Sequence, residues 1–266
     1  MTGPNGSEQV EPNKNSVNIE LSSDHMKKAE KKGMRTLGLI GGTSWHSTIE
    51  YYRNINQLVN DHFGNNTNPP LLVYTLNQSA IHRYQTASQW DIVAQLLTDA
   101  AISLQRAGAE AVMFCANTPH KVYDEVRQKL DIPIIHIAEA TAKVIQDKGI
   151  SKVCFIGTKF SMEEDFLTRI IADKEIEVLV PVDKDVIEEL HRIIHEELTF
   201  GKIISKSKQY VLNTLQSMIE LGAEGVVLGC TEFPLMISQE DLSVPVFNTT
   251  EIHSKAARDY ILMLDH

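Results

Sequence analysis

The most constraining feature of the sequence is a pair of short apolar runs, each followed at once by small and nucleophilic residues. One run is 111–114 and the other is 226–229. After the first come Cys115-Ala116-Asn117-Thr118-Pro119-His120, and after the second come Cys230-Thr231-Glu232-Phe233. In an open α/β sheet, ligands bind beyond the carboxyl ends of the strands. We call each strand end, together with the residues that follow it, a corner. Two such corners, about a domain's length apart, predict one site between two similar halves.

The segments that precede the two corners also resemble each other. Ala107-Gly108-Ala109-Glu110 leads into the first run, and Leu221-Gly222-Ala223-Glu224 leads into the second. This internal echo indicates a duplicated α/β unit. Apolar strand-like runs alternate with helical patterns along the chain, which is typical of parallel sheets. We therefore expect an α/β fold in which each half has a mainly parallel sheet flanked by helices.

Composition narrows the class of protein. A chain of 266 residues with 42% hydrophobic residues is long enough for one or two domains with a sizeable core. Apolar runs are too short to span a bilayer, and the N-terminus lacks a signal-peptide pattern. Three cysteines are too few for a disulfide framework, which favours a reducing, cytoplasmic location. The net charge of −10 argues against a nucleic-acid partner and leaves a small-molecule substrate.

Three segments of the first half bear on the site. Residues 1–33 are polar and lack a period that could bury a face, so they are expected to form a flexible leader. A strand over 36–40 runs into Gly41-Gly42-Thr43-Ser44, a tight turn that lets a ligand approach the backbone. This turn lacks the spacing of a dinucleotide site or a P-loop. The polar segment 77–90 is predicted to be a long functional loop, with Gln85 among its possible site residues.

The chemistry of the corners leaves several reactions open. No CxxC, HxxxH or HExxH pattern of a metal site occurs apart from the pair His191 and His195, which an amphipathic helix would place on a solvated face. A Cys-His hydrolase would use Cys230 and His120, but no third, orienting group is visible. Proton transfer at carbon needs only a thiolate and donors for the developing negative charge. Cys230 would sit near the amides at the start of a helix, whose partial positive charge favours a thiolate over a thiol.

At this point the motifs resemble those of the cofactor-independent aspartate/glutamate racemase superfamily, and most of all its broad-specificity amino-acid and aspartate racemase branch. The resemblance covers residues 34–264. It is carried by four motifs: Leu39-Ile40-Gly41-Gly42-Thr43-Ser44-Trp45 with Tyr51-Tyr52-Arg53, Cys115-Ala116-Asn117-Thr118-Pro119-His120-Lys121, Gly157-Thr158, and Leu228-Gly229-Cys230-Thr231-Glu232. It implies two Rossmann-like domains with the active site in the cleft between them, no pyridoxal phosphate, no metal, a homodimer, and an acidic amino acid as substrate.

The resemblance also suggests domain boundaries and site residues. The N-terminal domain would cover 34–136 and be completed by the C-terminal helix at 249–266, and the second domain would cover 137–248. Cys230 would be the catalytic base for one face of the substrate. The predicted substrate-binding residues are Thr43, Gln85, Ala116, Asn117, Thr118, Thr231, Glu232 and, as a cation for a side-chain carboxylate, Lys202.

One departure from the family pattern stands out. Relatives that use two cysteines have the first immediately before Asn-Thr, where this chain has Ala116. Cys115 lies one position too early, and neighbouring strand residues point to opposite faces, so Cys115 is expected in the core. Because alanine cannot transfer a proton, three functions stay open. They are a racemase, one-sided or not, a single-cysteine isomerase or decarboxylase of a small dicarboxylate, and a binding relative without turnover.

Overall fold

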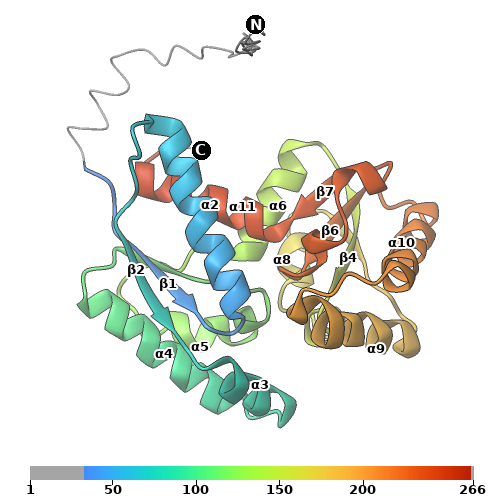
Figure 1. Cartoon of the computed structure of the whole chain (residues 1–266), viewed down its shortest axis with the longest axis horizontal. Coiled ribbons are helices and arrows are strands. Elements are labelled where there is room, and N and C mark those ends of the chain that lie inside the picture. Colours follow the sequence, from blue (N-terminus) through green and yellow to red (C-terminus); the bar gives the residue numbers. More distant parts are fainter. Residues whose placement is uncertain (1–32, 265–266) are drawn as a thin grey trace, which may run out of the picture. The chain divides into compact units, whose positions relative to one another are not determined.

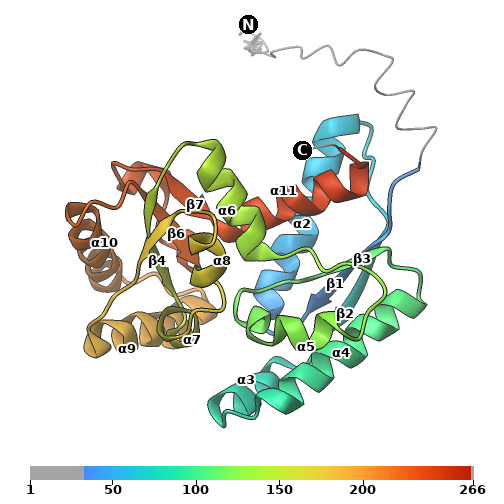
Figure 2. The same cartoon turned by 180° about the vertical axis from the view of Figure 1, so that it is seen from behind.

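The structure is a computed structural model, and it describes residues 33–264. The predicted leader, 1–33, therefore lies outside the described residues except for Gly33. From Met34 onward the chain forms one compact unit. That unit contains two parallel sheets with helices packed against them, so the predicted α/β fold is confirmed (Figures 1 and 2).

The first sheet has three parallel strands in the order β2-β1-β3. They are β1 Leu37–Gly41, β2 Leu71–Thr75 and β3 Ala111–Phe114. All residues of β1 and β3 are buried, because both faces of these apolar strands are covered by helices. Residues 133–136 form no strand, and Ile134 pairs with Val112 only in an isolated bridge.

The second sheet has four parallel strands in the order β5-β4-β6-β7. They are β4 Lys152–Gly157, β5 Glu177–Leu179, β6 Gly225–Gly229 and β7 Val246–Asn248. Strand β6, which carries the second corner, lies between β4 and β7 and is buried along its whole length. Its last residue, Gly229, pairs with Gly157, so the loops after β4 and β6 start side by side.

The helices follow the alternating order that the sequence predicts, with one local difference. The segment 77–90 is mostly helical, because the Asn77 side chain caps the N-terminus of α3 by accepting from the Ala80 amide. Further along the chain, α7 and α8 are single short turns of helix, and α9 changes to a π-helical turn at Ile193. The α-helices are α2 Trp45–Phe63, α3 Gln78–Thr86, α4 Trp90–Arg106, α5 Tyr123–Arg127, α6 Ile137–Asp147, α7 Lys159–Glu163, α8 Thr168–Ala172, α9 Lys184–Arg192, α10 Ser205–Glu220 and α11 Thr249–Leu262. Shorter turns are η1 Thr118–Val122, η2 Ile193–Glu197, η3 Leu198–Phe200, η4 Phe233–Leu235 and η5 Gln239–Asp241.

The two similar segments, 107–110 and 221–224, also make similar contacts in the structure. The carboxylate of Glu110 accepts from the Thr36 amide at 2.7 Å, just before β1, while that of Glu224 accepts from the Ser151 amide at 3.0 Å, just before β4. Each glutamate thus ties the strand it precedes to the neighbouring strand of its sheet. The glycine two residues earlier adopts a positive φ in both copies.

Helix α11 leads from β7 of the second sheet back to the first. It packs against α2 and α6 and buries Ala257 and Ile261 with Leu37 and Leu39 (Figures 1 and 2). The C-terminal helix therefore joins the core of the first sheet. The boundaries at 136/137 and 248/249 themselves stay a prediction, because residues from 34 onward form a single compact unit.

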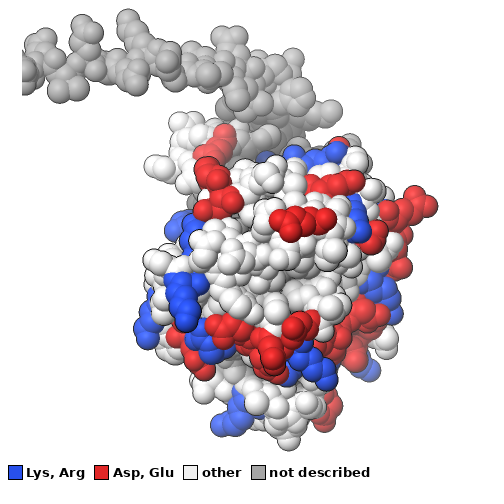
Figure 3. Space-filling view, turned by 90° about the vertical axis from the view of Figure 1, so that its right-hand side faces the viewer, with Lys and Arg blue, Asp and Glu red and all other residues white. Residues whose placement is uncertain are grey.

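No helix within residues 33–264 is long and apolar enough to cross a membrane. Figure 3 shows the side of the molecule on which α9 and α10 lie, and its Lys and Arg side chains are interspersed with Asp and Glu.

Candidate active site

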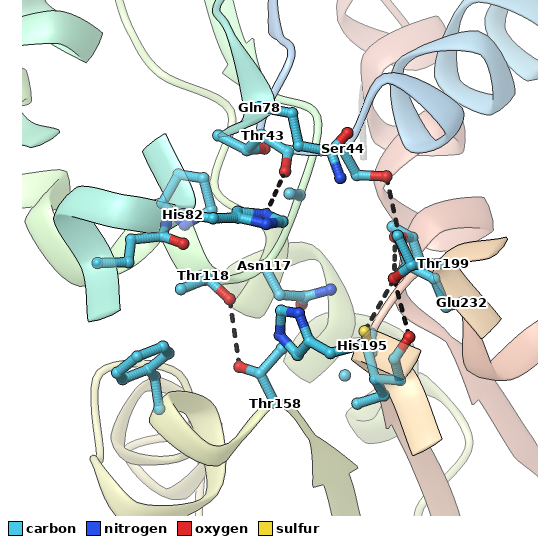
Figure 4. Close-up of a pocket in the computed structure, with 18 residues that line it drawn as sticks. Thr43, Ser44, Gln78, His82, Asn117, Thr118, Thr158, His195, Thr199 and Glu232 are labelled. Atoms are coloured by element: carbon cyan, nitrogen blue, oxygen red, sulfur yellow. Dashed lines mark hydrogen bonds between the residues drawn. The ribbon is translucent and has the colours of Figure 1, made fainter. Parts of the chain in front are cut away.

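A cavity lies at the carboxyl ends of β1, β3, β4 and β6. Both sheets contribute to it, as the two corners predict. Figure 4 shows the side chains that surround it. The lining residues are Thr43, Ser44, Gln78, His82, Gln85, Ala116, Asn117, Thr118, Pro119, Thr158, Phe160, Ile194, His195, Thr199, Gly229, Cys230, Thr231 and Glu232.

The chain at the end of β6 places Cys230 and Glu232 side by side. Gly229 is required here, because a Cβ at this position would lie about 2.0 Å from the ring of Phe155. The turn that follows brings the Cys230 thiol to 2.9 Å from Oε2 of Glu232, to which it donates a hydrogen bond. Both side chains are buried, with 6% and 7% of their surface exposed. A thiol and a carboxylate in a desolvated cavity can exchange a proton.

Cys230 is a thiol in this structure, which corrects the expectation of a thiolate. Burial is the largest cause that raises its pKa well above the usual value, and the neighbouring Glu232 carboxylate raises it further. Hydrogen bonds from the backbone amides of Glu232 and Thr231 lower the pKa by less. The amide effect that the sequence suggested is therefore present, but desolvation and a second negative charge outweigh it.

Glu232 is held by donors from both halves of the chain. It accepts hydrogen bonds from the hydroxyls of Thr231, at 2.7 Å, and Ser44, at 3.1 Å, in addition to the Cys230 thiol. Ser44 also caps α2, accepting from the Ser47 amide. The turn before it needs Gly42, whose φ is +85° and whose added Cβ would collide with the backbone of Leu76. The Gly-Gly-Thr-Ser turn thus serves to position a carboxylate partner.

Two consecutive hydrogen bonds, one donated by Thr249 and one donated to it, determine the orientation of the Asn117 amide. Thr249 donates its hydroxyl hydrogen to the carbonyl oxygen of Leu228 at 2.9 Å, so its oxygen is left to accept. It accepts from Nδ2 of Asn117 at 3.1 Å. Oδ1 of Asn117 is buried and has no partner in residues 33–264. The site therefore presents an unused acceptor, which calls for a donor such as an ammonium group.

The other predicted binding residues divide into two groups. Thr43, Gln85, Thr118 and Thr231 line the cavity, and the Thr43 hydroxyl is also buried without a partner in the described chain. Lys202 does not line it. Its ammonium lies 5.6 Å from the ring centre of Phe200, and the residue is exposed. The prediction of Lys202 as a cation inside the site is thus not supported by its position.

The sequence model of the Asp/Glu/Hydantoin racemase family matches residues 40–257. This protein belongs to that family.

Individual relatives agree with this result. A Yersinia pestis protein that is provisionally assigned as an Asp/Glu racemase is 43% identical in sequence, with a TM-score of 0.81 over 86% of this chain and 100% of its own. An aspartate racemase homologue from Pyrococcus horikoshii OT3 is 40% identical, with a TM-score of 0.74 over 84% of this chain and 97% of its own. The broad specificity amino-acid racemase of Bacillus subtilis is 22% identical over 62% of this chain and 71% of its own. The protein is accordingly an isomerase of the racemase class.

In this racemase-family protein, the corner after β3 carries no acid or base. Ala116 lines the cavity, whereas Cys115 is fully buried in the core with Leu39 and Met113, as strand alternation predicts. Burial also raises the pKa of the Cys115 thiol. The cavity therefore contains one thiol, that of Cys230.

His120, which the sequence offers as a base, is part of the scaffold behind this corner. Its Nδ1 donates to the carbonyl oxygens of Ala116 and Asn117, both at 3.1 Å, and its Nε2 accepts from the Ile137 amide at 3.3 Å. Burial lowers its pKa well below the usual value, with further lowering by His136 and His253. His120 holds the backbone of the corner and does not line the cavity.

Sequence reasoning missed two histidines that line the cavity, His82 and His195. His82 was assigned to a loop and His195 to a solvated helix face, but α3 and the π-helical turn η2 bring both into the site. Their rings meet edge to face with centroids 5.5 Å apart (Figure 4). No group of three metal-binding side chains occurs within residues 33–264, and these two histidines form none. The i, i+4 spacing of His191 and His195 was the one sequence signal that could have indicated a functional histidine in this helix.

Proposed function

We propose that this racemase-family protein is a cofactor-independent amino-acid racemase in which Cys230 moves a proton at the α-carbon of an aspartate- or glutamate-like substrate. The observation that carries the proposal is the buried pair of Cys230 and Glu232, which lines the same cavity as Asn117, whose buried amide oxygen has no partner in residues 33–264. The membership of the chain in a racemase family supports the reaction class.

On one face of the substrate, the Cys230 thiol and the Glu232 carboxylate transfer the proton together. When Glu232 takes the thiol proton, the resulting thiolate can remove the α-proton of a bound amino acid. In the reverse sense, the thiol gives its proton to the planar carbanion and Glu232 restores it. The donors from Ser44 and Thr231 keep Glu232 within reach of the sulfur through both steps.

Substrate recognition rests on the groups that stay unsatisfied without a ligand. The ammonium group of an amino acid would donate to Oδ1 of Asn117, which is otherwise a costly buried acceptor. The hydroxyls of Thr43 and Thr118 can donate to the α-carboxylate, with Gln85 at the same wall, while the Thr231 hydroxyl stays on Glu232. The acidic side chain is supported by the names of the relatives: one is an aspartate racemase homologue and one an Asp/Glu racemase by assignment.

A second function is favoured by one observation. Because Ala116 leaves a single thiol in the cavity, a one-sided isomerase or decarboxylase of a small dicarboxylate would also use Cys230. Such a substrate has no ammonium group, so it would leave Oδ1 of Asn117 unpaired. A relative that binds amino acids without turnover is the third reading. We rank the racemase first, because the ammonium group of an amino acid would pair with Oδ1 of Asn117 and a dicarboxylate would not.

The test is chiral chromatography of L- and D-aspartate, glutamate, and a panel of neutral amino acids incubated with the protein. We expect each active pair to approach a racemic mixture, and Cys230→Ser to reduce the rate at least 1,000-fold. Cys115→Ala is the matched control, because this thiol is buried in the core, and it should stay within threefold of the wild type per folded molecule. A full panel without inversion would contradict the racemase assignment.

We also propose that the protein acts as a homodimer in the cytoplasm. A surface next to the site supports the dimer: Trp45, Ile49, Phe200 and Leu235 each expose half or more of their large apolar side chains. Light scattering after size exclusion should give about twice the chain mass, and Phe200→Glu should shift it toward the monomer. A monomer mass for the wild type at micromolar concentration would contradict the dimer.

A further inference from the structure

Inversion at carbon requires one proton carrier on each face of the substrate, and the β3 corner offers only the methyl group of Ala116. The cavity nevertheless contains four side chains that can carry a proton: Cys230, Glu232, His82 and His195. Glu232 is engaged with Cys230 and its two hydroxyl donors, so it belongs to the first face. The second carrier is therefore to be sought among the two histidines.

The two histidines differ in how far their nitrogens are already used. Nε2 of His82 lies 2.9 Å from the carbonyl oxygen of Thr43. Since a carbonyl oxygen can only accept, His82 donates this hydrogen, and its ring is fixed by a structural bond. The ring nitrogens of His195 make no hydrogen bond within residues 33–264, although the ring packs against those of His82 and His191. His195 is thus the cavity histidine with both nitrogens available to a ligand.

The local backbone singles out the same residue. His195 lies in η2, a π-helical turn that interrupts the continuation of α9. Such turns occur often at functional sites, since the extra residue redirects a side chain that the regular helix would place elsewhere. Figure 4 shows the ring of His195 among the side chains that surround the cavity, which Asn117 also lines. An imidazole thus lines the same cavity as the group that we expect to hold the substrate ammonium.

The protonation state of His195 suits a base. Burial is the main cause that lowers its pKa to about 4, with further lowering by His191 and His82 and a smaller opposing effect of Glu232. The ring is therefore neutral near pH 7 and can accept a proton. Cys230, by contrast, is protonated and can donate one, so the resting site already holds an acid and a base.

We propose that His195 is the second proton carrier of the racemase, in place of the cysteine that Ala116 lacks. This inference rests on the proposed function. In one direction the lone pair of a His195 ring nitrogen takes the α-proton, and the C–H bond pair stays on the substrate as a carbanion conjugated with its carboxylate. The Cys230 thiol then gives its proton to the opposite face of that carbon. The products are the inverted amino acid, an imidazolium and a thiolate.

The reverse direction uses the products of the first. The Cys230 thiolate removes the α-proton, and the imidazolium returns its proton to the other face. After product release, the imidazolium loses one proton to water and the thiolate regains one, so the resting pair is restored and no oxidant or other reactant is needed. One enantiomer thus reacts with the enzyme form that has a Cys230 thiol and a neutral His195, and the other reacts with the form that has a thiolate and an imidazolium. The two forms contain the same number of protons.

The experiment is α-proton exchange in D2O, followed by proton NMR for each pure enantiomer, with wild type, His195→Gln and Cys230→Ser. His195→Gln should lose racemisation at least 100-fold. It should still exchange the α-proton of one enantiomer, that which faces Cys230, with retention of configuration. The opposite enantiomer should become inert. Cys230→Ser should show the mirror pattern and exchange only the enantiomer that faces His195.

Two controls separate a proton carrier from a structural role. His191→Gln changes the neighbouring histidine of α9, which lies outside the cavity lining, and should stay within threefold of wild type. The double variant Ala116→Cys, His195→Gln restores a carrier on the β3 corner and should recover at least tenfold of the lost racemisation. Thermal unfolding of each variant should be checked, so that rates refer to folded protein.

Each other outcome counts against the inference. If His195→Gln racemises within twofold of wild type, His195 carries no proton, while the proposed function stands. If it loses exchange of both enantiomers equally and Ala116→Cys rescues nothing, His195 only holds the substrate or the fold. If the wild type exchanges no α-proton of any amino acid, the proposed function fails, and this inference fails with it.

Discussion

The two corners occupy equivalent places in two similar sheets, yet they carry different chemistry. The corner after β6 holds a thiol and a carboxylate that share a hydrogen bond. The corner after β3 presents a methyl group and a carboxamide with one free acceptor. The similar architecture of the two sheets thus determines where the two corners lie, but not what they do. In our account one corner transfers a proton and the other mainly holds the substrate.

The scaffolds behind the corners differ as well. Three buried histidines, His120, His136 and His253, lie in ring contact behind the β3 corner. The β6 corner is backed by Phe155, which fills the space that a side chain at Gly229 would need. The structure behind the β3 corner therefore requires neutral imidazoles. We expect these three histidines to make the largest contribution to the loss of folding stability at acidic pH.

The largest effect should follow from removing the charge beside the thiol. Glu232→Gln keeps a group of the same shape but cannot take the thiol proton, so kcat should fall about 100-fold or more. The thiol itself should alkylate faster with iodoacetamide at pH 8, because Glu232 is one cause of its raised pKa. Racemisation rates and alkylation rates, measured on the same preparation, check both. Slower alkylation together with normal kcat would contradict the role of Glu232.

The next effect concerns the acid sensitivity of the β3 corner. Burial lowers the pKa of His136 to about 4, so the unfolded chain binds the proton more readily below the usual value of 6.5. Its contribution to stability is complete above pH 6.5 and is lost as the pH falls toward 4. Between pH 7 and pH 5 this one residue should cost about 2 kcal/mol, or about 30-fold in the unfolding equilibrium.

His136→Asn tests this contribution. Asparagine can still cap α6 as His136 does, through the bond from the Ala138 amide. Urea unfolding at pH 7 and pH 5 should show that the variant loses about 2 kcal/mol less than the wild type over this range. An equal loss in the two proteins would exclude His136 as a source of the pH dependence.

A smaller effect should come from making the two corners alike. Ala116→Cys installs a thiol on the β3 corner of the otherwise unchanged protein, and racemisation should rise about tenfold if a second thiol is the better carrier. Ala116→Ser, which has a similar size and no acidic proton, is the matched control. Chiral chromatography with initial rates in both directions measures it. An unchanged rate for both cysteine and serine would place the residue 116 side chain away from the substrate carbon.

The smallest effect should follow from freeing the Asn117 amide. Thr249→Val removes the oxygen to which Nδ2 donates, so the amide can turn and no longer presents Oδ1 reliably to the ligand. KM should rise about fivefold with little change in kcat, and Thr249→Ser, which keeps the hydroxyl, should behave like the wild type. Steady-state kinetics of the three proteins decide this. A change in kcat alone would contradict the binding role.

Much of this arrangement could be predicted from the sequence, because strand alternation and small-residue turns are local signals. The positions of Cys230 and Cys115 follow from such signals alone. Helix α3 was missed since a polar segment hides a helix whose start depends on one capping side chain, Asn77. His195 was missed because the regular helical period fails at a π-helical turn. The state of the Cys230 thiol was wrong because it depends on burial and on Glu232, which are tertiary properties.

The most direct test of the difference between the corners is the time course of α-proton loss in D2O for the single variants Cys230→Ser and Asn117→Ser, each compared with wild type on both enantiomers of one active amino acid. The account predicts that Cys230→Ser abolishes exchange of one enantiomer and leaves substrate binding intact. Asn117→Ser should weaken binding for both enantiomers equally and leave exchange at saturation within about tenfold. If Asn117→Ser instead removes exchange of one enantiomer only, or Cys230→Ser leaves both unchanged, the assignment of proton transfer to one corner and holding to the other is wrong.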